Sequence, residues 1–464
     1  MAYGGYDTID VMIKFFNSKT RELEEFTPIE TGQVSMYSCG PTVYDYPHIG
    51  NARAYVFADL LKRTLIFNGL SVKHVMNITD VDDKTIRDSQ KQGKSLKEFT
   101  EFYTVGFMND LDSLNVIPAD TFPKATEHIP EMVKMIETLI DNDNAYKAPD
   151  GSTYFDISSF SKYGELSRVD LSSTKQTERV ASDEYTKDNV QDFALWKAYD
   201  PKDGDVAWET TLGKGHPGWH IECSAMSTKY LGNHFDIHTG GVDNMFPHHE
   251  NEIAQSVCCN GGEFVNYWLH NSHLMVDGKK MSKSDGNFYT LRDLQEKGFS
   301  PVAFRYFLLQ AHYRTQTNFT LEAVEASQNA LRNIHHLARG LISGFLSSLL
   351  AKESVEYLDK FTEAINDDLD APKGLALTWE MLKDNSLKSA SKLKTLLKMD
   401  EFLGLGIQES LDFKVPNDIK KLAAQREKAR KEKDWQTADT LRDELKTKGY
   451  TILDTENGPV IEKI

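Results

Sequence analysis

The feature that most constrains the fold is a strand, a turn, a long helix and a second strand in direct succession. Residues 33–39 are predicted to form a strand that gives way to a turn at Gly40. Apolar residues spaced three and four positions apart then predict a helix from Ile49 to Asn68, and residues 71–77 follow as a strand. This β-α-β succession predicts a parallel sheet with helices packed on it.

The remaining sequence indicates further segments around this unit. Residues 80–145 are predicted to be mostly helical, whereas 144–216 is rich in Ser, Thr, Asp and Gly and is predicted to be an insertion into the sheet domain. The β-α-β pattern resumes after Gly218, with a helix predicted from His248 to Cys259, and nearly all of 301–405 is predicted to be helical. The 464 residues correspond to two to four domains at roughly 100–200 residues each.

Composition excludes several classes of protein. Hydrophobic residues make up 40% of the chain and charged residues 27%, which is typical of a soluble globular protein and too apolar for disorder. The start of the chain lacks the basic and apolar regions of a signal peptide, and no run approaches the ~20 apolar residues that cross a bilayer. We therefore expect a cytoplasmic protein without a membrane partner. Its cysteines are expected to be buried, reactive or bound to metal instead of joined in disulfides: Cys39, Cys223, Cys258 and Cys259.

Charge is distributed unevenly along the chain. The net charge of −17 argues by itself against a nucleic-acid-binding protein, because phosphates favour a basic surface. Residues 420–450, however, carry ten basic and six acidic residues, a net charge of +4. A helix rich in lysine and arginine can be a solvated face or a contact with RNA phosphate, and the sequence leaves both open.

Two stretches have the character of phosphate-binding sites. The first, His48-Ile49-Gly50-Asn51, opens the first long helix, where free N–H groups and the helix dipole favour an anion. Gly50 lets a ligand approach the backbone, and His48 and Asn51 can both donate hydrogen bonds. The structural alternative is a helix cap with a core histidine, which this stretch taken alone favours.

The second stretch, Lys279 to Asn287, follows a predicted strand and combines clustered ammonium groups with small residues. Lys280 and Lys283 are three residues apart and can converge on one polyphosphate, where they would stabilise growing negative charge. A basic surface loop is the alternative, and the Lys-Met-Ser-Lys-Ser string makes it the weaker one.

A third glycine-rich stretch is interpreted as unrelated to nucleotide binding. Gly213 to Gly218 fits the dinucleotide fingerprint G-x-G-x-x-G, and Asp236 follows at a suitable distance. Pro217 stands where the fingerprint should open a helix, however, and Asp236 falls inside a predicted strand. NAD is therefore not expected as a ligand.

A histidine and a carboxylate at the start of a predicted helix indicate a metal site. His248 and Glu252 are four residues apart, so they project from the same face and can grip one ion. Cys39 ends the first strand of the core and Cys223 lies in a helix before the next strand, so both are expected at the sheet edge where ligands gather. Two thiolates, an imidazole and a carboxylate are a tetrahedral zinc set.

Other candidate ligands remain open. His220 is one, whereas helical spacing predicts that His249 and Glu250 turn away from the face defined by the metal-binding pair. Cys258 and Cys259 are adjacent in the same helix and are interpreted as packing residues.

Together these motifs resemble class I aminoacyl-tRNA synthetases. The resemblance rests on His48-Ile49-Gly50-Asn51, similar to the family's His-Ile-Gly-His motif, and on the Lys-Met-Ser-Lys-Ser loop. The strings CGPTVYD from Cys39, NITD from Asn77, GWHIECSAM from Gly218 and FPHHENEIAQ from Phe246 resemble the cysteinyl-tRNA synthetase family in particular, over residues 12 to about 455. Asn51 departs from the prototype's histidine but can still donate a hydrogen bond.

The resemblance implies three groups of site residues. The zinc ligands would be the set already suggested by the chemistry: Cys39, Cys223, His248 and Glu252. The cysteine pocket would comprise Thr42, Thr79, Trp219, His238 and Asp243. ATP, bound with Mg²⁺, would contact His48, Gly50, Asn51, Lys280, Met281, Ser282, Lys283 and Ser284. Among these, the catalytic residues that stabilise charge during adenylate formation would be His48, Asn51, Lys280 and Lys283.

The resemblance also implies an architecture and partners. We expect an α/β fold, with a Rossmann-like parallel-sheet catalytic domain and an inserted connective domain, followed by an all-α helical bundle and a small C-terminal domain. The expected boundaries are 1–143 and 217–300 for the two catalytic halves, 144–216 for the insertion, 301–345 for a stem-contact region, 346–408 for the anticodon-binding bundle, and 409–464 for a small basic tRNA-binding domain. The implied partners are tRNA(Cys), L-cysteine and ATP, and we expect a monomer.

The activity implied by the resemblance is activation of cysteine with ATP to cysteinyl-adenylate and its transfer to tRNA(Cys). Such an enzyme must reject serine, and an apolar pocket separates near-isosteres by only about 10²-fold. A zinc ion prefers a thiolate to a hydroxyl, so the substrate sulfur would add a fifth ligand or displace one of the four.

Two other functions share parts of this signature. A ligase that joins cysteine to an amino-sugar has the same zinc site and adenylation motifs but lacks a full anticodon-binding tail, so the basic tail argues against it. A catalytically silent paralogue that binds zinc, thiol or RNA would not need an intact Lys-Met-Ser-Lys-Ser loop beside a complete ligand set. Cysteine-dependent ATP–pyrophosphate exchange separates the enzyme from such a binding protein.

Overall fold

The computed structural model describes residues 12–168, 192–281, 286–345, 351–455 and 458–463. Its centre is a sheet of four strands that all run parallel, in the order β11-β10-β3-β4. The strands are β3 (Gln33–Ser38), β4 (Ser71–Met76), β10 (Phe235–Gly241) and β11 (Val265–Asn271). The parallel sheet expected from the β-α-β pattern is therefore confirmed.

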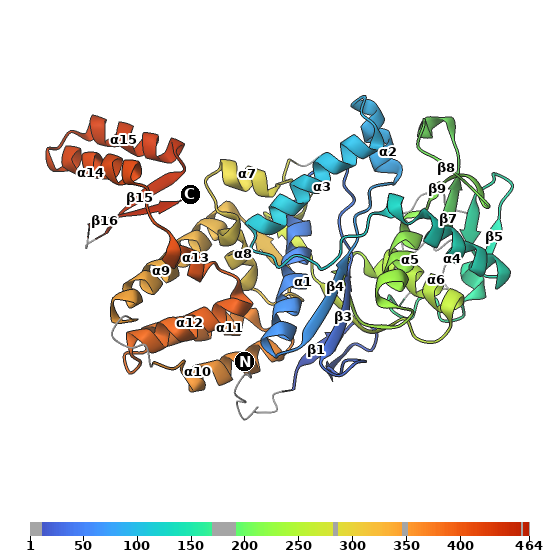
Figure 1. Cartoon of the computed structure of the whole chain (residues 1–464), viewed down its shortest axis with the longest axis horizontal. Helices are drawn as coiled ribbons and strands as arrows, with labels where there is room; N and C mark the ends of the chain where they lie inside the picture. Colours follow the sequence, from blue (N-terminus) through green and yellow to red (C-terminus); the bar gives the residue numbers. More distant parts are fainter. Residues whose placement is uncertain (1–11, 169–191, 282–285, 346–350, 456–457, 464) are drawn as a thin grey trace.

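Helices cover both faces of this sheet. The helix α1 (Ile49–Phe67) connects β3 to β4 and lies beside them in the centre of the molecule (Figure 1). Its residues Phe57 and Leu61 share one apolar cluster with Met36 of β3. Tyr37 points to the opposite face, because side chains alternate along a strand, and there it shares a cluster with Cys223. That second face is covered by α5 (Trp219–Leu231) and α6 (Glu250–Asn260).

The pairing of β10 with β3 joins two halves of the chain that are far apart in sequence. Ile237 of β10 lies opposite Met36 of β3, with β10 and β3 parallel. Because all four strands point the same way, their carboxyl ends meet at one edge of the sheet. The residues that follow β3, β4, β10 and β11 are therefore close in space.

The segment before the insertion is mostly helical, as predicted. It contains α2 (Asp83–Lys91), α3 (Leu96–Ser113), a 3₁₀ turn η1 (Ala125–Glu127) and α4 (Ile129–Asp141). Ahead of the central sheet, β1 (Lys14–Asn17) and β2 (Glu22–Glu25) form a small antiparallel hairpin.

The insertion forms an antiparallel sheet of its own, in the order β5-β6-β7-β9-β8. Its elements are β5 (Ala145–Lys147), β6 (Thr153–Phe155), η2 (Ile157–Ser159), β7 (Phe193–Ala198), η3 (Pro201–Asp203), β8 (Trp208–Thr210) and β9 (Gly213–Pro217). The run that mimics a dinucleotide fingerprint thus lies in β9, an antiparallel strand. Asp236 accepts hydrogen bonds from the Ile29 and Ser35 backbone N–H groups at 2.6 and 2.7 Å. This carboxylate therefore has a structural role in holding the chain around β3.

From Leu291 to Asp412 the described residues are mainly helical. The helices are α7 (Leu291–Glu296), α8 (Pro301–Leu309), α9 (Leu321–Phe345), α10 (Val355–Asn366), α11 (Ala371–Lys383), α12 (Ser389–Leu403) and α13 (Ile407–Asp412). The mostly helical region predicted from 301 to 405 is confirmed, and it is interrupted by the short strand β14 (Thr317–Phe319). This strand buries Phe319 and pairs in parallel with β12 (Leu274–Val276), which also pairs with β13 (Lys279–Lys280).

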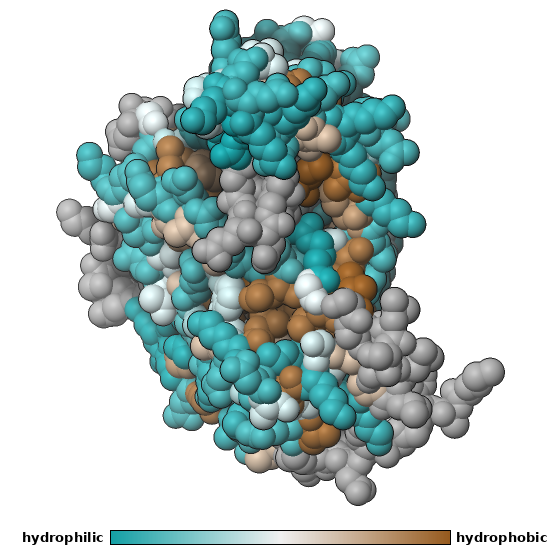
Figure 2. All heavy atoms as spheres, turned by 90° about the vertical axis from the view of Figure 1, so that its left-hand side faces the viewer, coloured by the Kyte–Doolittle hydropathy of each residue, from teal (hydrophilic) through white to brown (hydrophobic). Residues whose placement is uncertain are grey.

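The C-terminal segment forms a small unit with its own apolar cluster. The helices α14 (Asn417–Lys431) and α15 (Trp435–Thr447) precede the hairpin of β15 (Tyr450–Thr455) and β16 (Gly458–Lys463). Ile419, Ala423, Leu445 and Ile452 are buried together. The end of the molecule that carries α14 and α15 is covered mainly by hydrophilic residues (Figure 2). Within the described ranges, no helix combines the length and the apolar character needed to cross a membrane.

Candidate functional site

The four predicted zinc ligands converge at the carboxyl edge of the central sheet. Cys39 follows β3 directly, Cys223 lies in α5, and His248 and Glu252 lie around the start of α6. One ligand atom from each residue lies within 4.8 Å of the others. We call these four residues the Cys223 set. Because β3 and β10 are neighbours in the sheet, segments more than 200 positions apart in sequence meet here.

Contacts with neighbours orient the two ligands of the α6 region. His248 Nε2 lies 3.1 Å from Glu252 Oε1, which places both residues on one face as predicted. The Trp219 ring stacks on the His248 ring with 4.3 Å between centroids. His248 Nδ1 lies 2.9 Å from Nδ1 of His220. One nitrogen of His248 is therefore held from outside, while the other faces the carboxylate.

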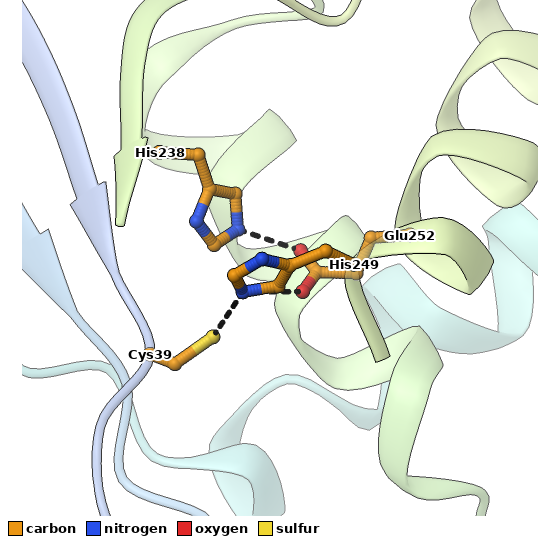
Figure 3. Close-up of side chains that lie close together, drawn as sticks. All are labelled: Cys39, His238, His249 and Glu252. Atoms are coloured by element: carbon orange, nitrogen blue, oxygen red, sulfur yellow. Dashed lines mark hydrogen bonds and ion pairs between the residues drawn. The ribbon is translucent and has the colours of Figure 1, made fainter. Parts of the chain in front are cut away.

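His249 lies inside the site, contrary to the prediction that it turns away. Its Nε2 lies 3.2 Å from Cys39 Sγ and 4.0 Å from Glu252 Oε1 (Figure 3). The prediction overlooked that His249 and Glu252 are three positions apart, a spacing that also places two side chains side by side on a helix. The extended residue Phe246 lies before this stretch, and His249 itself has helical backbone angles.

His249 and His238 complete a second possible donor group. His238 Nε2 lies 2.9 Å from Glu252 Oε2, and ligand atoms of Cys39, His238, His249 and Glu252 also lie within 4.8 Å of one another (Figure 3). We call these four residues the His249 set. It shares Cys39 and Glu252 with the Cys223 set, so the two sets describe overlapping positions for one ion.

A chain of polar contacts holds His249 from the side opposite Cys39. His249 Nδ1 lies 2.8 Å from His270 Nε2, and His270 Nδ1 lies 2.8 Å from Ser18 Oγ. A histidine in a metal site is typically oriented in this way, by a partner that contacts its second ring nitrogen. Glu250 does turn away as predicted, since its carboxylate accepts hydrogen bonds from backbone N–H groups of the 164–167 segment at 2.7 and 2.9 Å.

Burial determines the protonation of these groups. It raises the pKa of the Cys39 thiol and raises that of Cys223 far above its usual range, and the nearby Glu252 carboxylate acts in the same direction. Burial also lowers the pKa of His248 to about 3 and that of His249 well below the usual range. The imidazoles are therefore neutral, the form that binds metals, and a divalent cation would offset the cost of forming the thiolates.

The donor chemistry fits a zinc ion. The Cys223 set offers two sulfurs, one imidazole nitrogen and one carboxylate oxygen, which is a tetrahedral combination. Glu252 Oε1 is buried and accepts no hydrogen bond from the described residues, so a buried carboxyl oxygen is available. Three of the four residues are buried, and Cys39 is half-buried at the side of an open cavity.

The predicted phosphate-binding stretch at the start of α1 is both a helix cap and a cavity wall. His48 is the N-cap, and its Nδ1 accepts a hydrogen bond from the Asn51 backbone N–H at 3.1 Å. Asn51 Oδ1 accepts in turn from the His48 N–H at 3.2 Å. This assigns the ring proton of His48 to Nε2 and leaves Nδ2 of Asn51 as a donor. A Cβ at Gly50 would lie 2.9 Å from the His48 ring, so glycine keeps this turn accessible.

One cavity of about 390 Å³ joins this helix start to the metal-ligand edge. At one end it is lined by His48, Gly50, Asn51, Lys280 and Met281. At the other end it is lined by Cys39, Thr42, Trp219 and Asp243. Ser282, Lys283 and Ser284 lie outside the described residues.

The residues assigned to the cysteine pocket divide between the cavity and the layer behind it. Thr42, Trp219 and Asp243 line the cavity. Thr79 is buried and forms a parallel backbone bridge with Thr42, and His238 is fully buried beside the ligand carboxylate. The structure therefore gathers all five near Cys39, with three at the cavity surface.

Comparisons with known proteins identify the family. The family described as "tRNA synthetases class I (C) catalytic domain" matches residues 25–329, and "Cysteinyl-tRNA ligase anticodon binding domain" matches residues 414–458. The cysteine–tRNA ligase of Brachyspira hyodysenteriae is 48% identical over 96% of this chain and 98% of its own length. The cysteine–tRNA ligase of Chlamydia muridarum is 46% identical over 97% of this chain and 99% of its own length. This chain belongs to the cysteine–tRNA ligase family.

Solved structures show that this ligase shares its fold with synthetases for other amino acids. The structure of Mycobacterium tuberculosis methionyl-tRNA synthetase in complex with methionyl-adenylate aligns with a TM-score of 0.61. The alignment covers 83% of this chain and 94% of the methionyl-tRNA synthetase chain. A LeuRS of Agrobacterium radiobacter aligns with a TM-score of 0.59, over 83% of this chain and 86% of the LeuRS chain. Sequence identities of 14% and 11% limit this likeness to the fold, which confirms the Rossmann-like class.

Sequence reasoning missed several residues of the ligase that line the cavity. Two of them, Tyr44 and Asp45, lie in the CGPTVYD string that begins at Cys39. The others belong to none of the motifs described above: Tyr46, Tyr55, Lys84, Asn244, Asn271 and Phe288. The Phe288 ring stands 5.4 Å from that of His48, and Glu222, fully buried, accepts a hydrogen bond from Thr79 Oγ1 at 2.7 Å. Glu222 lies within the string that begins at Gly218, which was the available signal.

Proposed function

We propose that this chain activates L-cysteine with ATP to cysteinyl-adenylate and transfers the cysteinyl group to tRNA(Cys). We also propose one zinc ion per chain, held by the Cys223 set, and Mg²⁺ bound with ATP. The observation that carries the proposal is the cavity whose two ends combine soft metal donors with a phosphate-binding helix start.

The amino-acid end of the cavity suits a small thiol. A zinc ion bound there would supply a Lewis acid that takes a thiolate and leaves the hydroxyl of serine protonated and weakly held. Trp219 forms an apolar wall beside His248, and Asp243 offers a carboxylate for the substrate ammonium group. Thr42 lies at the surface of the same end, with Thr79 and His238 behind it.

The other end suits the phosphates of ATP. The first turn of α1 places the positive end of the helix dipole at the cavity, and His48 can donate from Nε2 to an oxygen of the α-phosphate. Lys280 adds a positive charge at the cavity wall. We assign Asn51 and Lys283 to the same stabilisation of charge, and Ser282 and Ser284 to ATP contacts. The attacking carboxylate comes from the substrate, so positioning and charge stabilisation account for the catalysis.

The C-terminal region suits a tRNA partner. The match of residues 414–458 to a cysteinyl-tRNA ligase anticodon-binding domain supports tRNA(Cys) over an amino-sugar as the acceptor. The net charge of +4 over residues 420–450 supports contact with phosphate. We propose that the six residue ranges given above are the functional units of the chain. We also propose that the protein is a monomer that acts in the cytoplasm.

ATP–pyrophosphate exchange with cysteine and serine, run side by side, tests the proposal. Metal content is measured on the same sample before and after treatment with a chelator. We expect exchange with cysteine only, loss of exchange with loss of zinc, and recovery when zinc is returned. Equal preference for cysteine over serine in fully stripped protein would contradict the role of the metal, and absence of exchange in zinc-loaded protein would contradict the activity.

A further inference from the structure

A group of aromatic rings lies at the mouth of the cavity, outside the residues assigned above. Tyr46, which lines the cavity, lies 6.0 Å from the Phe102 ring and 5.2 Å from the Tyr103 ring of α3, measured between centroids. The guanidinium carbon of Arg292, in α7, lies 3.4 Å from the centroid of Tyr46. The rings thus connect the loop after β3 with two helices beside the cavity.

Gly106 permits this close packing. A Cβ at this position would lie 2.7 Å from the Tyr46 ring and 3.4 Å from Arg292 Nη2. A side chain here would displace the ring, so the glycine lets α3 approach the loop closely enough to fix Tyr46. The position of Tyr46 at the cavity mouth is therefore built into the packing of α3.

Two apolar residues are exposed on the outer face of α3 beside Tyr46, flanked by the exposed carboxylates of Glu98 and Glu101. Phe102 exposes 51% of its surface and Val105 exposes 52%, whereas Phe99 and Phe107 on the inner face are completely buried. A helix of a globular protein ordinarily turns residues of this kind inward. Spaced three apart, Phe102 and Val105 lie on the same side of α3 and extend the aromatic group outward.

Positive charge accompanies the rings. Lys94 Nζ lies 5.3 Å from the centroid of Phe102, within the range of a cation–π contact. Arg292 Nη1 is buried without a hydrogen-bond partner in the described part of the chain. The carboxylate paired with this guanidinium, Asp110, stays 4.0 Å away, between Oδ1 and Nη2. The positive charge at the rings is therefore only partly offset.

We propose that Tyr46, Phe102, Val105 and Arg292 form a platform on which the unpaired 3′ nucleotides of tRNA stack before the terminal hydroxyl enters the cavity. This inference rests on the proposed function, because it names a contact of the proposed tRNA substrate. Exposed rings accompanied by cations are the combination that binds single-stranded nucleic acid, since every base has a face that stacks and every nucleotide carries a phosphate.

The place of the platform supports this occupant. Only the unpaired end of the tRNA carries the hydroxyl that must reach the cavity, and Tyr46 belongs to both the cavity wall and the platform. Lys84 also lines the cavity, with its Nζ 5.5 Å from the centroid of Tyr44. In Figure 1, α3 and α7 lie between the C-terminal helices α14 and α15 on one side and the insertion on the other. A tRNA held at both regions would pass this face.

Binding of two RNAs to the full-length protein tests the platform. One is intact tRNA(Cys), and the other lacks its four unpaired 3′ nucleotides. In the wild type we expect truncation to weaken binding. For Phe102→Ala we expect about a tenfold loss with intact tRNA, equivalent to about 1.4 kcal/mol, and little further loss on truncation. Phe102→Trp should restore the wild-type response. Leu23→Ala, at an exposed apolar residue of β2, is the matched control.

Each outcome bears on the platform separately from the proposed function. Pyrophosphate exchange with cysteine needs no RNA and is measured on every sample to report whether the adenylation site is assembled. A wild type that neither exchanges pyrophosphate nor charges tRNA would contradict the proposed function itself. The platform alone would be overturned if the wild type charges tRNA but Phe102→Ala weakens the binding of both RNAs equally or of neither.

Discussion

Arg305 of α8 and Asp59 of α1 form an ion pair of 2.6 Å, from Nη2 to Oδ2, in which neither side chain is exposed. Arg63 adds a second contact to the same carboxylate oxygen at 2.7 Å. Arg305 Nε also donates to the Leu403 backbone oxygen at the end of α12, at 2.7 Å. Because α1 begins at the cavity, this pair ties a wall of the cavity to α8 and α12.

We predict that Asp59→Asn costs about 3–5 kcal/mol in free energy of unfolding, because it removes the carboxylate that contacts both buried arginines and leaves them only the more distant charge of Asp400 nearby. Chemical denaturation measures the loss. Arg87→Ala is the control, since Arg87 pairs with Asp88 at the surface with its side chain 55% exposed, and should cost at most about 1 kcal/mol. Similar losses for the two variants would contradict the importance of the buried pair.

The two overlapping donor sets predict different effects on metal content. We expect Cys223→Ser to lose most bound zinc while the protein remains folded, because a hydroxyl is a poor zinc ligand. We expect His249→Asn to keep its zinc, since His249 contacts the Cys39 thiol as a supporting residue held by His270. Elemental analysis and competition with a chelator give the metal content. The reverse result would assign the ion to the His249 set.

Gly40 is predicted to be intolerant of any side chain. A Cβ there would lie 1.7 Å from the backbone oxygen of Asn77, so Gly40→Ala must displace β4 or the turn that carries Cys39. We expect a loss of at least about 1–3 kcal/mol in stability together with weaker zinc retention. Gly340→Ala is the control, because nothing lies within 4 Å of its Cβ position in α9, and there we expect a small stabilisation. Unfolding curves and chelator competition check both variants.

His74 is predicted to make the protein sensitive to acid. Burial and the nearby Lys62 lower its pKa to about 3, so the folded chain keeps this imidazole neutral while the unfolded chain protonates it below about 6.5. The unfolded state then binds more protons, and stability falls as pH drops from 6.5 toward 3, by up to about 1.4 kcal/mol per pH unit from this residue.

Denaturation at pH 7 and pH 5 tests this pH dependence in wild type and His74→Gln. We expect His74→Gln to lose less stability between the two pH values, whatever its absolute stability. His234→Gln changes an exposed histidine and controls for the substitution itself. If His74→Gln loses as much stability between pH 7 and pH 5 as the wild type does, another group causes the acid sensitivity.

Local patterns in the sequence predicted the elements that build the site. The apolar spacing of α1, the strands on either side of it and the ligand pair His248 and Glu252 follow from periodicities of two and of 3.6 residues, which act over one turn or one strand. The same logic failed at His249, because it overlooked that residues three apart, here His249 and Glu252, also lie side by side on a helix. Within the region predicted to be mostly helical, Thr317–Phe319 form a strand because they pair with β12.

The sequence by itself determined the chemistry available to this protein: two thiols, an imidazole and a carboxylate for the metal, and a helix start with basic residues for phosphate. Only the tertiary structure decided which of these groups meet. Cys39 and Cys223 come together because β10 pairs with β3, and the same pairing brings Cys39 against His249. Such meetings depend on long-range strand pairing and packing, which leave no periodic signal in the residues they join.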